Sequence, residues 1–331
     1  MSTVGTSPSA TSSPLLAIEG LRVGFRAAGG GVIEAVRGVD FTVAPGEAVG
    51  IVGESGSGKS LSMLAVMRLL GSTAGITGGR ITFDGRDLTA LGEAEMRRLR
   101  GRDLAMVFQD PQSSLNPALT IGRQIADVVR AHRGVGQTEA RRVAAEALER
   151  VGIRDAGRRL DAYPHEFSGG MRQRALIAMA IACRPRLLIA DEPTTALDVT
   201  VQAQIVDLIA DLRRDLGLAV VFISHNLQLV AEIVDRVVVM YGGKVVEDGP
   251  VETIERAARH PYTRLLRSCV PRLDGPVGPL ATIEGTPPRL GRMPAGCPFE
   301  PRCPCREALC ATEMPPLVAA EAHRLACWRP Q

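Results

Sequence analysis

Residues 47–60 read Glu-Ala-Val-Gly-Ile-Val-Gly-Glu-Ser-Gly-Ser-Gly-Lys-Ser, and this stretch decides the fold. A short apolar strand enters a loop of the pattern G-x-x-x-x-G-K-S. A helical pattern follows, with one predicted apolar side formed by Leu61, Leu64, Ala65, Met67 and Leu70. Glycines let the loop backbone turn its N–H groups toward one centre, and the helix N-terminus adds its positive dipole end. The stretch therefore predicts a phosphate-binding loop rather than a merely flexible Gly/Ser turn.

The predicted loop supplies the first candidate binding residues. Lys59 is one of only two lysines in the chain, and its slim cation can reach the outer phosphates of a nucleotide. Ser60 follows it and can ligate a magnesium ion. The expected binding set is Gly53, Ser55, Gly56, Ser57, Gly58, Lys59 and Ser60.

Composition limits the class of protein. A length of 331 residues favours one large domain and a smaller one, and a hydrophobic content of 45% is enough for a substantial core. A net charge of +3 and 3% aromatic residues argue against a nucleic-acid-binding face. The longest apolar run, residues 175–183, is too short to span a bilayer, and no signal peptide opens the chain. We therefore expect a cytosolic protein, in which disulfides are disfavoured.

Local patterns predict the order of helices and strands. Residues 1–14 are rich in Ser, Thr and Pro and are expected to be disordered. Thr138 is expected to cap a helix. The predicted strands are 15–25, 32–43, 79–85, 104–108, 186–191 and 218–223, with a hairpin at 237–246. The predicted helices are 93–100, 121–132, 138–151, 175–183 and 199–216.

A second apolar strand ends in two adjacent carboxylates, Asp191 and Glu192. A wholly apolar strand is buried on both faces, as in a parallel sheet, and burying carboxylates is costly without a cation. Magnesium beside Asp191 would reduce that cost, and Glu192 could then polarise a water molecule. His225 follows the next buried strand, and ligands of such sheets bind beyond the carboxyl ends of the strands. His225 is therefore a candidate sensor of a terminal phosphate.

Other candidate residues are weaker when taken alone. Phe25 can stack on a purine or be an ordinary core or edge residue. Gln109 leaves a predicted strand and can bind magnesium and a water, or cap a turn. Ser168, Gly169 and Gly170 open a helix, where an anion-binding nest and a plain N-cap have the same sequence pattern.

These motifs, in this order, make residues 15–250 resemble the nucleotide-binding subunit of an ATP-binding-cassette (ABC) transporter. The phosphate loop, Gln109, Ser168-Gly169-Gly170, Asp191-Glu192, Asp198 and His225 carry the resemblance. It implies an α/β P-loop NTPase with a RecA-like core, an antiparallel β-subdomain and a helical subdomain at about 110–183. It also implies two ATP molecules, each held between the phosphate loop of one cassette and the Ser168-Gly169-Gly170 signature of the other. Met171 departs from the commonest signature, which has Gln there, while the Ser and Gly residues are intact.

The C-terminal part, residues 251–331, contains a cysteine motif. Cys297, Cys303, Cys310 and Cys327 have the spacing C-x5-C-x6-C-x16-C, which suggests thiolate ligation of zinc or an iron–sulfur cluster. Cys305 is an alternative ligand, and Cys183 and Cys269 are interpreted as ordinary buried thiols. Residues 260–266 resemble a segment of the dipeptide/oligopeptide/nickel importer ATPases, and the cysteine motif resembles that of D-type ATPase subunits of dipeptide and oligopeptide permeases. That resemblance implies a small cysteine-rich domain with a 4Fe–4S cluster.

The resemblance implies an ATPase subunit of a peptide importer at the cytoplasmic face of the cell membrane. Its implied partners are a second, homologous ATPase subunit, two membrane permease subunits and an extracytoplasmic peptide-binding protein. The implied roles are phosphate stabilisation by Lys59, orientation of water by Glu192 and a switch role for His225. Nickel, a sugar or another small solute remains an alternative cargo. A soluble cassette ATPase acting on nucleic acid or ribosomes is a further alternative, but the chain has one cassette, no heptad run and no basic patch.

Overall fold

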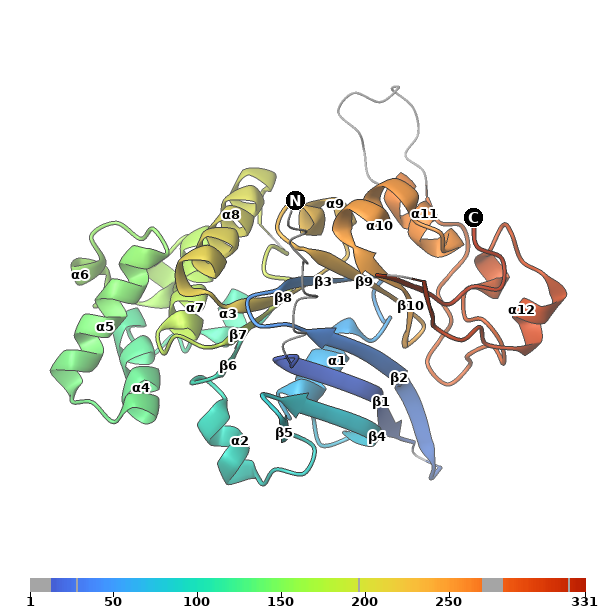
Figure 1. Cartoon of the computed structure of the whole chain (residues 1–331). Helices are drawn as coiled ribbons and strands as arrows, with labels where there is room; N and C mark the ends of the chain where they lie inside the picture. Colours follow the sequence, from blue (N-terminus) through green and yellow to red (C-terminus); the bar gives the residue numbers. More distant parts are fainter. Residues whose placement is uncertain (1–12, 28, 196, 270–281, 321) are drawn as a thin grey trace, which may run out of the picture.

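Two β-sheets with helices around them form the protein in the computed structural model (Figure 1). The structure describes residues 13–27, 29–195, 197–269, 282–320 and 322–331. The expected disorder at residues 1–14 therefore falls almost wholly outside the described residues. An eight-stranded sheet has the order β11-β12-β10-β9-β3-β8-β7-β6, and a four-stranded sheet has the order β2-β1-β4-β5.

The centre of the large sheet is parallel. Its parallel strands are β3 (Ala48–Val52), β6 (Leu104–Val107), β7 (Leu187–Asp191), β8 (Ala219–Ser224) and β9 (Arg236–Tyr241). Strand β10 (Lys244–Pro250) pairs with β9 antiparallel, which confirms the predicted hairpin. The predicted apolar strands are confirmed because these strands are buried on both faces.

Alternate residues of the parallel strands enter two separate cores, as the period of two in a β-strand requires. In β3, Val49 and Ile51 pack between the two sheets, whereas Ala48 and Val52 pack under the helices on the opposite face. Strand β7 divides in the same way, with Ile189 on the first side. The large sheet is therefore the middle layer of the molecule.

The four-stranded antiparallel sheet lies on one face of the middle layer, as Figure 1 shows below β3. It contains β1 (Leu16–Arg26), β2 (Val32–Val43), β4 (Ala74–Phe83) and β5 (Arg86–Asp87). Helix α1 (Lys59–Val66) packs against this sheet, and the short helix α2 (Glu93–Leu99) follows β5. The predicted apolar side of α1 is partly wrong. The helix ends before Leu70, and Ser62, Met63 and Val66 are buried while Leu61 and Leu64 are only half-buried, because α1 is covered from more than one side.

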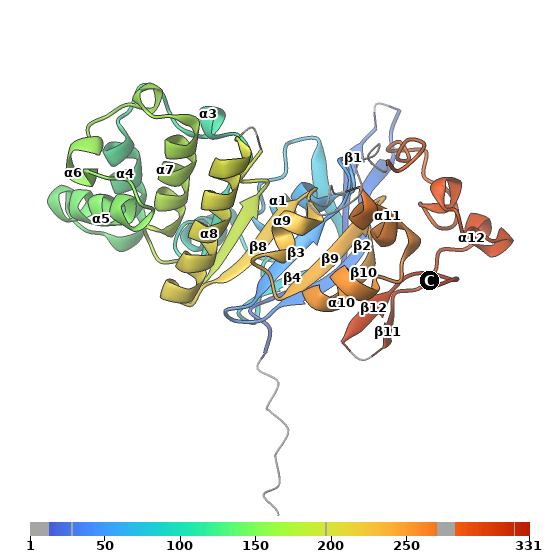
Figure 2. The same ribbon diagram turned by 90° about the horizontal axis from the view of Figure 1, so that it is seen from above.

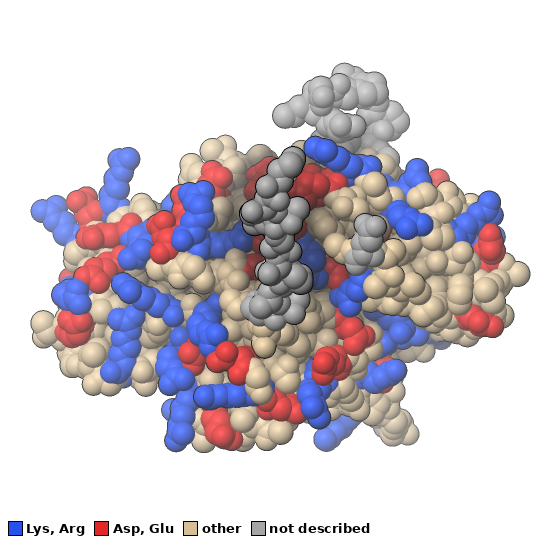
Figure 3. All heavy atoms as spheres, in the orientation of Figure 1, with Lys and Arg blue, Asp and Glu red and all other residues tan. Residues whose placement is uncertain are grey.

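Helices cover the other face and extend to one side of the sheet (Figures 1 and 2). They are α3 (Pro111–Ser114), α4 (Ile121–Arg133), α5 (Gln137–Arg150), α6 (Ala156–Arg159), η1 (Pro164–Glu166), α7 (Gly169–Ile181) and α8 (Val199–Leu216). The predicted cap at Thr138 is wrong, because α5 is capped by Gly136 and Thr138 lies exposed within its first turn. On the face seen in Figure 3, basic and acidic side chains are interspersed over these helices.

The C-terminal part packs directly on the cassette. After β10 come α10 (Val251–Ala257) and α11 (Pro261–Ser268), and α9 (Leu227–Ala231) lies nearby. The described residues from 282 to the C-terminus, called here the cysteine segment, contain η2 (Glu300–Arg302), α12 (Ala308–Thr312), β11 (Val318–Ala320) and β12 (His323–Leu325). Strand β12 pairs with β10 and so extends the middle layer. Phe299 is fully buried in the core beneath the helices, so this segment shares the core of the cassette.

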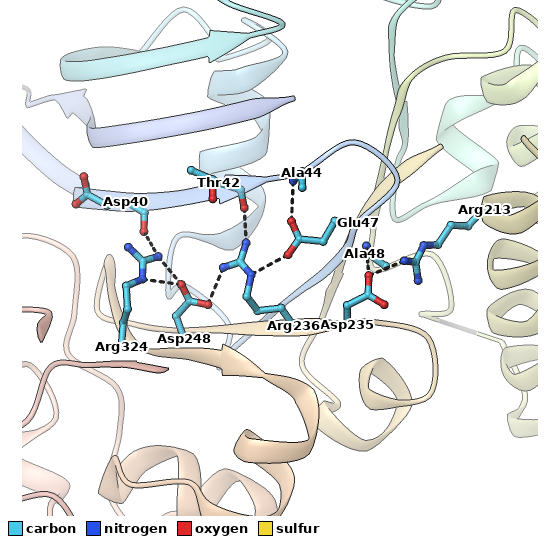
Figure 4. A network of polar contacts seen from close by, with 10 residues as sticks. All are labelled: Asp40, Thr42, Ala44, Glu47, Ala48, Arg213, Asp235, Arg236, Asp248 and Arg324. Atoms are coloured by element: carbon cyan, nitrogen blue, oxygen red, sulfur yellow. Dashed lines mark hydrogen bonds and ion pairs between the residues drawn. The ribbon is translucent and has the colours of Figure 1, made fainter. Parts of the chain in front are cut away.

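A polar network joins the two sheets and the cysteine segment (Figure 4). Arg236 donates to Glu47 Oε1 at 2.8 Å, to Asp248 Oδ1 at 2.7 Å and to the carbonyl of Thr42 in β2. Arg324 of β12 donates to Asp248 Oδ2 at 2.9 Å. Arg236 and Asp248 are largely buried, and each has a second charged partner, Glu47 for Arg236 and Arg324 for Asp248. Both charges are therefore compensated within the network.

Candidate functional site

The carboxyl ends of four parallel strands meet at one edge of the middle layer. Val52 of β3 lies opposite Ser224 of β8, and Asp191 of β7 lies opposite Ile223. Val107 of β6 lies opposite Ala190. The residues that follow these strand ends, including Gly53, Gln109, Glu192 and His225, therefore leave the sheet at the same edge, as the sequence predicted.

The loop from Gly53 to Gly58 has a backbone that only glycine fits at two positions. Gly53 has a φ of 153°, and a Cβ there would lie 2.2 Å from the carbonyl oxygen of Met240. Gly58 has a φ of 99°, and a Cβ there would lie 3.3 Å from the carbonyl oxygen of Ala35. The loop is thus wound closely against β2 and β9 before α1 begins.

Lys59 is buried at the start of α1, with 4% of its surface exposed. Its Nζ donates to the carbonyl oxygens of Gly53 at 2.8 Å and Glu54 at 3.0 Å. Burial lowers the pKa of Lys59, and the neighbouring carboxylates of Glu192, Asp191 and Glu54 oppose that shift. The ammonium group of Lys59 is therefore held over the loop, where it can contact a bound phosphate.

Ser60 and Asp191 contact each other across the site. The Ser60 hydroxyl donates to Asp191 Oδ1 at 2.7 Å. Burial raises the pKa of Asp191, and the hydrogen bond from Ser60 and the charge of Lys59 partly offset this. A hydroxyl and a carboxylate at this spacing are oxygen ligands of the kind that magnesium prefers.

Three side chains from three different segments contact the carboxylate of Glu192. Its Oε2 accepts from Thr195 Oγ1 at 3.0 Å and from Gln109 Nε2 at 3.3 Å, and His225 Nδ1 lies 3.4 Å away. Glu192 also has a φ of 45°, in the left-handed region that non-glycine residues rarely adopt. Such strain persists where the surroundings fix the residue, and it is typical of functional sites. The Glu192 carboxylate is thus fixed by its backbone and by contacts with Thr195, Gln109 and His225.

A buried hydroxyl in the loop has no partner. Ser57 is 3% exposed, and its Oγ makes no hydrogen bond with any described residue. Leaving such a group unpaired costs about 1–3 kcal/mol. An anionic oxygen bound in the loop would satisfy it, so the residues present fit a phosphate group. Ser55 and Gly56 form the exposed tip of the same loop.

The remaining predicted residues lie on the helical side. Ser168 caps α7, and its hydroxyl accepts from the N–H of Met171 at 3.3 Å. Gly170 lets α7 approach α8, since a Cβ there would lie 2.8 Å from a methyl of Val201. Asp198 caps α8 and accepts from the N–H of Val201 at 2.9 Å. Ser168, Gly169, Gly170 and Asp198 thus form a second group, at the adjoining starts of α7 and α8.

Phe25 is not part of either group. It lies half-buried on β1, opposite Ile33 of β2. The two alternatives for Phe25, a purine-stacking residue and an edge residue, therefore both fit its place in the fold.

Five cysteines line one small cavity of about 20 Å³, together with His260, Phe299 and Trp328. The cysteines are Cys297, Cys303, Cys305, Cys310 and Cys327. The backbone N–H of Cys297 donates to the carbonyl of Cys310 at 2.8 Å, which brings these two positions together. Among the described residues, no group of three or more His, Cys, Asp or Glu side chains is arranged to hold a metal ion.

Three residues that contact the site were not identified from the sequence. Thr195 donates to Glu192, Tyr262 accepts a hydrogen bond from the backbone N–H of Glu54 at 2.8 Å, and Arg302 pairs with the side chain of Glu54. Thr195 lies close to Asp191 in the sequence, so a local sequence pattern could have indicated it. Tyr262 and Arg302 are more than 200 positions from Glu54, and no local pattern signals their approach.

Comparisons with known proteins agree with this geometry. Residues 36–195 match the family model described as ABC transporter, and residues 246–310 match the one described as oligopeptide/dipeptide transporter, C-terminal region. A solved structure titled as the dimeric structure of MJ0796, a bacterial ABC transporter cassette, is 27% identical with a TM-score of 0.64. It covers 71% of this chain and 98% of that chain. Fold and site thus define an ABC-type ATP-binding cassette.

Curated relatives show which type of ABC protein the chain resembles. A "Putative peptide import ATP-binding protein" of Brucella abortus (strain 2308) is 51% identical over 322 residues, with 94% of this chain and 95% of the relative covered. A protein of the same description from Brucella suis biovar 1 (strain 1330) is 51% identical over 303 residues, with 92% and 91% covered. The chain belongs to the family of ABC transporter ATP-binding proteins of the oligopeptide/dipeptide type. None of the helices in the described ranges is long and apolar enough to cross a membrane.

Proposed function

We propose that this chain is the ATP-hydrolysing subunit of a membrane importer for di- or oligopeptides. The names of the relatives and the match over residues 246–310 support the peptide class. The observation that carries the ATPase assignment is the convergence of Lys59, Ser60, Asp191 and Glu192 at one sheet edge. Nickel or another small solute is the alternative cargo, because other subunits select what is bound.

Each residue at the sheet edge has a role in the proposed hydrolysis. Lys59 stabilises negative charge on the outer phosphates, and the loop N–H groups cradle them. Ser60 and Gln109 would hold a magnesium ion, and Asp191 would support it; the ion supplies charge neutralisation of the phosphates. Glu192 orients the attacking water, and the present contact between Glu192 and Gln109 is one that a bound nucleotide would replace.

The second group of residues serves a neighbouring cassette in this proposal. Ser168, Gly169 and Gly170 would bind the terminal phosphate of ATP held by the other cassette, while Asp198 and His225 lie at the junction. ATP then favours a closed head-to-tail pair, and hydrolysis reopens it, because ATP binds the closed pair better than ADP does. The proposed partners are a homologous ATPase subunit, two membrane permease subunits and an extracytoplasmic peptide-binding protein. The chain would thus lie peripherally at the cytoplasmic face of the cell membrane.

Glu192→Gln tests the proposed hydrolytic role. The amide keeps the shape but cannot act as a base, so ATP turnover should fall by about 100-fold or more while ATP binding is kept. The measurement is steady-state ATPase activity with all partner subunits present, together with the fraction of closed pairs on MgATP. Glu255→Gln is the matched control, since Glu255 is exposed on α10. Undiminished turnover in Glu192→Gln would remove Glu192 from this role.

The cysteine segment is the second part of the proposal. The shared cavity and the thiol chemistry of the donor set support binding of a 4Fe–4S cluster by Cys297, Cys303, Cys310 and Cys327, with zinc as the alternative. Such a group would cross-link a segment that has little core of its own. An absorption spectrum with iron and zinc assays on anaerobically purified protein tests this. About four iron atoms per chain with visible absorption are expected, and a protein free of both metals would overturn the assignment.

A further inference from the structure

Glu54, which follows the first glycine of the phosphate loop, forms an ion pair with Arg302 of the cysteine segment, 248 positions away. The pair is bidentate, with Arg302 Nη1 at 2.6 Å from Glu54 Oε2 and Nη2 at 3.0 Å from Oε1. The Arg302 side chain is 5% exposed. A bidentate pair at a largely buried site fixes orientation as well as distance. The two segments are therefore locked together at this point.

Every N–H group of Arg302 has an acceptor. Besides the two bonds to Glu54, Nη1 donates to the hydroxyl of Tyr241 at 3.0 Å and Nη2 to the carbonyl of Ile283 at 3.0 Å. Nε donates to the carbonyl of Glu284 at 2.9 Å. All five donors of a guanidinium are then used, and a lysine could not reproduce this fork. Arg302 is thus held in one orientation, facing the loop.

The backbone of Glu54 is held from the same side. Its N–H donates to the hydroxyl of Tyr262 in α11 at 2.8 Å, and Tyr262 is fully buried. The rings of Tyr262, Tyr241 and Phe299 pack on one another with centroids 4.6–5.3 Å apart. Side chain and backbone of Glu54 are therefore both anchored by elements that follow β8 in the chain.

Glu54 in turn orients the catalytic end of the loop. Its carbonyl accepts from Lys59 Nζ at 3.0 Å and from the N–H of Ser57 at 3.2 Å. A shift of Glu54 therefore moves the anchor of the buried lysine and the turn that carries Ser57. The hydrogen-bonded path from the cysteine segment to the phosphate-binding groups passes through Arg302 and Glu54, and the packing of Phe299 on Tyr262 supports the backbone of Glu54 from the same side.

We propose that Arg302 is a positioning residue for the phosphate loop, through which the cysteine segment sets the affinity of the cassette for ATP. Arg302 stands between Cys297 and Cys303, next to Cys303 in the chain, so a backbone displacement at Cys303 is transmitted to Arg302. The proposal rests on the ATP site described above. Under this proposal, the cysteine segment regulates the affinity of that site for ATP and is more than an attached domain.

A salt bridge that merely docks the segment is the competing explanation. Docking would affect stability, and every contact between the segment and the cassette would matter to a similar degree. Arg324 provides the comparison, because it joins the same segment to Asp248 and to the carbonyl of Asp40, away from the phosphate loop.

The test measures the dissociation constant of a non-hydrolysable ATP analogue with magnesium on the full chain. Arg302→Met should weaken binding by about tenfold, and Glu54→Ala by a similar factor. The double variant should be no weaker than either single variant, since both remove the same link. Arg324→Met should bind within about twofold of the unmodified chain. In steady-state turnover with the partner subunits, the Arg302→Met change should appear in KM more than in kcat.

Two further variants test the proposal even where Arg302→Met fails to fold. Arg302→Lys keeps the charge without the fork, and Tyr262→Phe removes only the hydroxyl that accepts from Glu54; each should weaken binding by about threefold or more. Unchanged affinity in the folded variants would overturn the proposal. Equal weakening in Arg302→Met and Arg324→Met would overturn it too, in favour of simple docking. Failure of the unmodified chain to bind the analogue would instead count against the ATP site itself.

Discussion

The sheet edge and the cysteine segment both bring reactive side chains together, but they do so by different means. At the sheet edge, parallel strands deliver Lys59, Asp191, Glu192 and His225 to one place, and the backbone geometry of β3, β7 and β8 sets their spacing. In the cysteine segment, short irregular turns bring the thiols to one cavity. Hydrogen-bonded strand register fixes the positions in the first arrangement, whereas short turns set them in the second. The comparison predicts that changes at the sheet edge abolish activity and changes in the cysteine segment only modulate it.

Lys59→Ala should have the largest effect. Removing the buried cation leaves the phosphate charge and the carboxylates of Asp191 and Glu192 without their nearest opposite charge, so ATP turnover should fall by at least about 100-fold. The measurement is turnover with the partner subunits present. Lys244→Ala is the control, because Lys244 is the other lysine of the chain and its charged neighbours are Arg37, Arg22, Asp40 and Glu34 rather than Asp191 or Glu192. Turnover within tenfold of normal for Lys59→Ala would contradict the assignment.

Gly53→Ala should have an intermediate effect on folding. The added methyl would meet the Met240 carbonyl at 2.2 Å at a φ that alanine disfavours, so unfolding should become easier by about 2 kcal/mol or more. Gly56→Ala is the matched comparison within the same loop. No atom lies within 4 Å of its added methyl, and its φ of 78° alone should cost about 1 kcal/mol. Chemical denaturation of the two variants measures the difference, and equal losses would show that the contact with β9 has no role.

Cys310→Ser should have the smallest effect on ATP and a clear one on metal. Under the proposed thiolate site, metal content should fall in part or wholly, and affinity for the ATP analogue should fall only about threefold, through release of Arg302. Cys183→Ser is the control, because Cys183 is half-buried on the helical side and does not line the cavity. Metal content and affinity are measured on the same anaerobic preparation. Full metal content in Cys310→Ser would rule out Cys310 as a ligand.

Much of the sheet edge could be predicted because each of its motifs is local. A glycine-rich loop, an apolar strand ending in Asp191-Glu192 and a histidine after the next strand each follow from a few consecutive residues, and parallel topology does the rest. The contacts of Glu192 with Gln109 and Thr195 were not predicted, because they depend on how the loops after β6 and β7 fold toward Glu192.

The errors and omissions come from packing at long range. The predicted face of α1 was wrong at Leu61, Leu64 and Leu70 but right at Ala65 and Met67, because neighbours on more than one side bury the helix and a single apolar stripe does not reveal this. Thr138 was a reasonable cap by residue type, but α5 begins at Gln137, before it. The pair of Glu54 and Arg302 joins residues 248 positions apart, and each occupies a position that the motif around it leaves variable. Sequence patterns therefore located the chemistry, whereas the contacts that tune it required the fold.

The central claim is that ATP held at this sheet edge is completed by the Ser168 turn of a second cassette. The most direct measurement is a structure of the Glu192→Gln complex with its partner subunits and MgATP. We expect the Ser168 hydroxyl at about 3 Å from the terminal phosphate of ATP bound by the neighbouring cassette. A Ser168 that faces no nucleotide of a neighbouring chain in that state would contradict it.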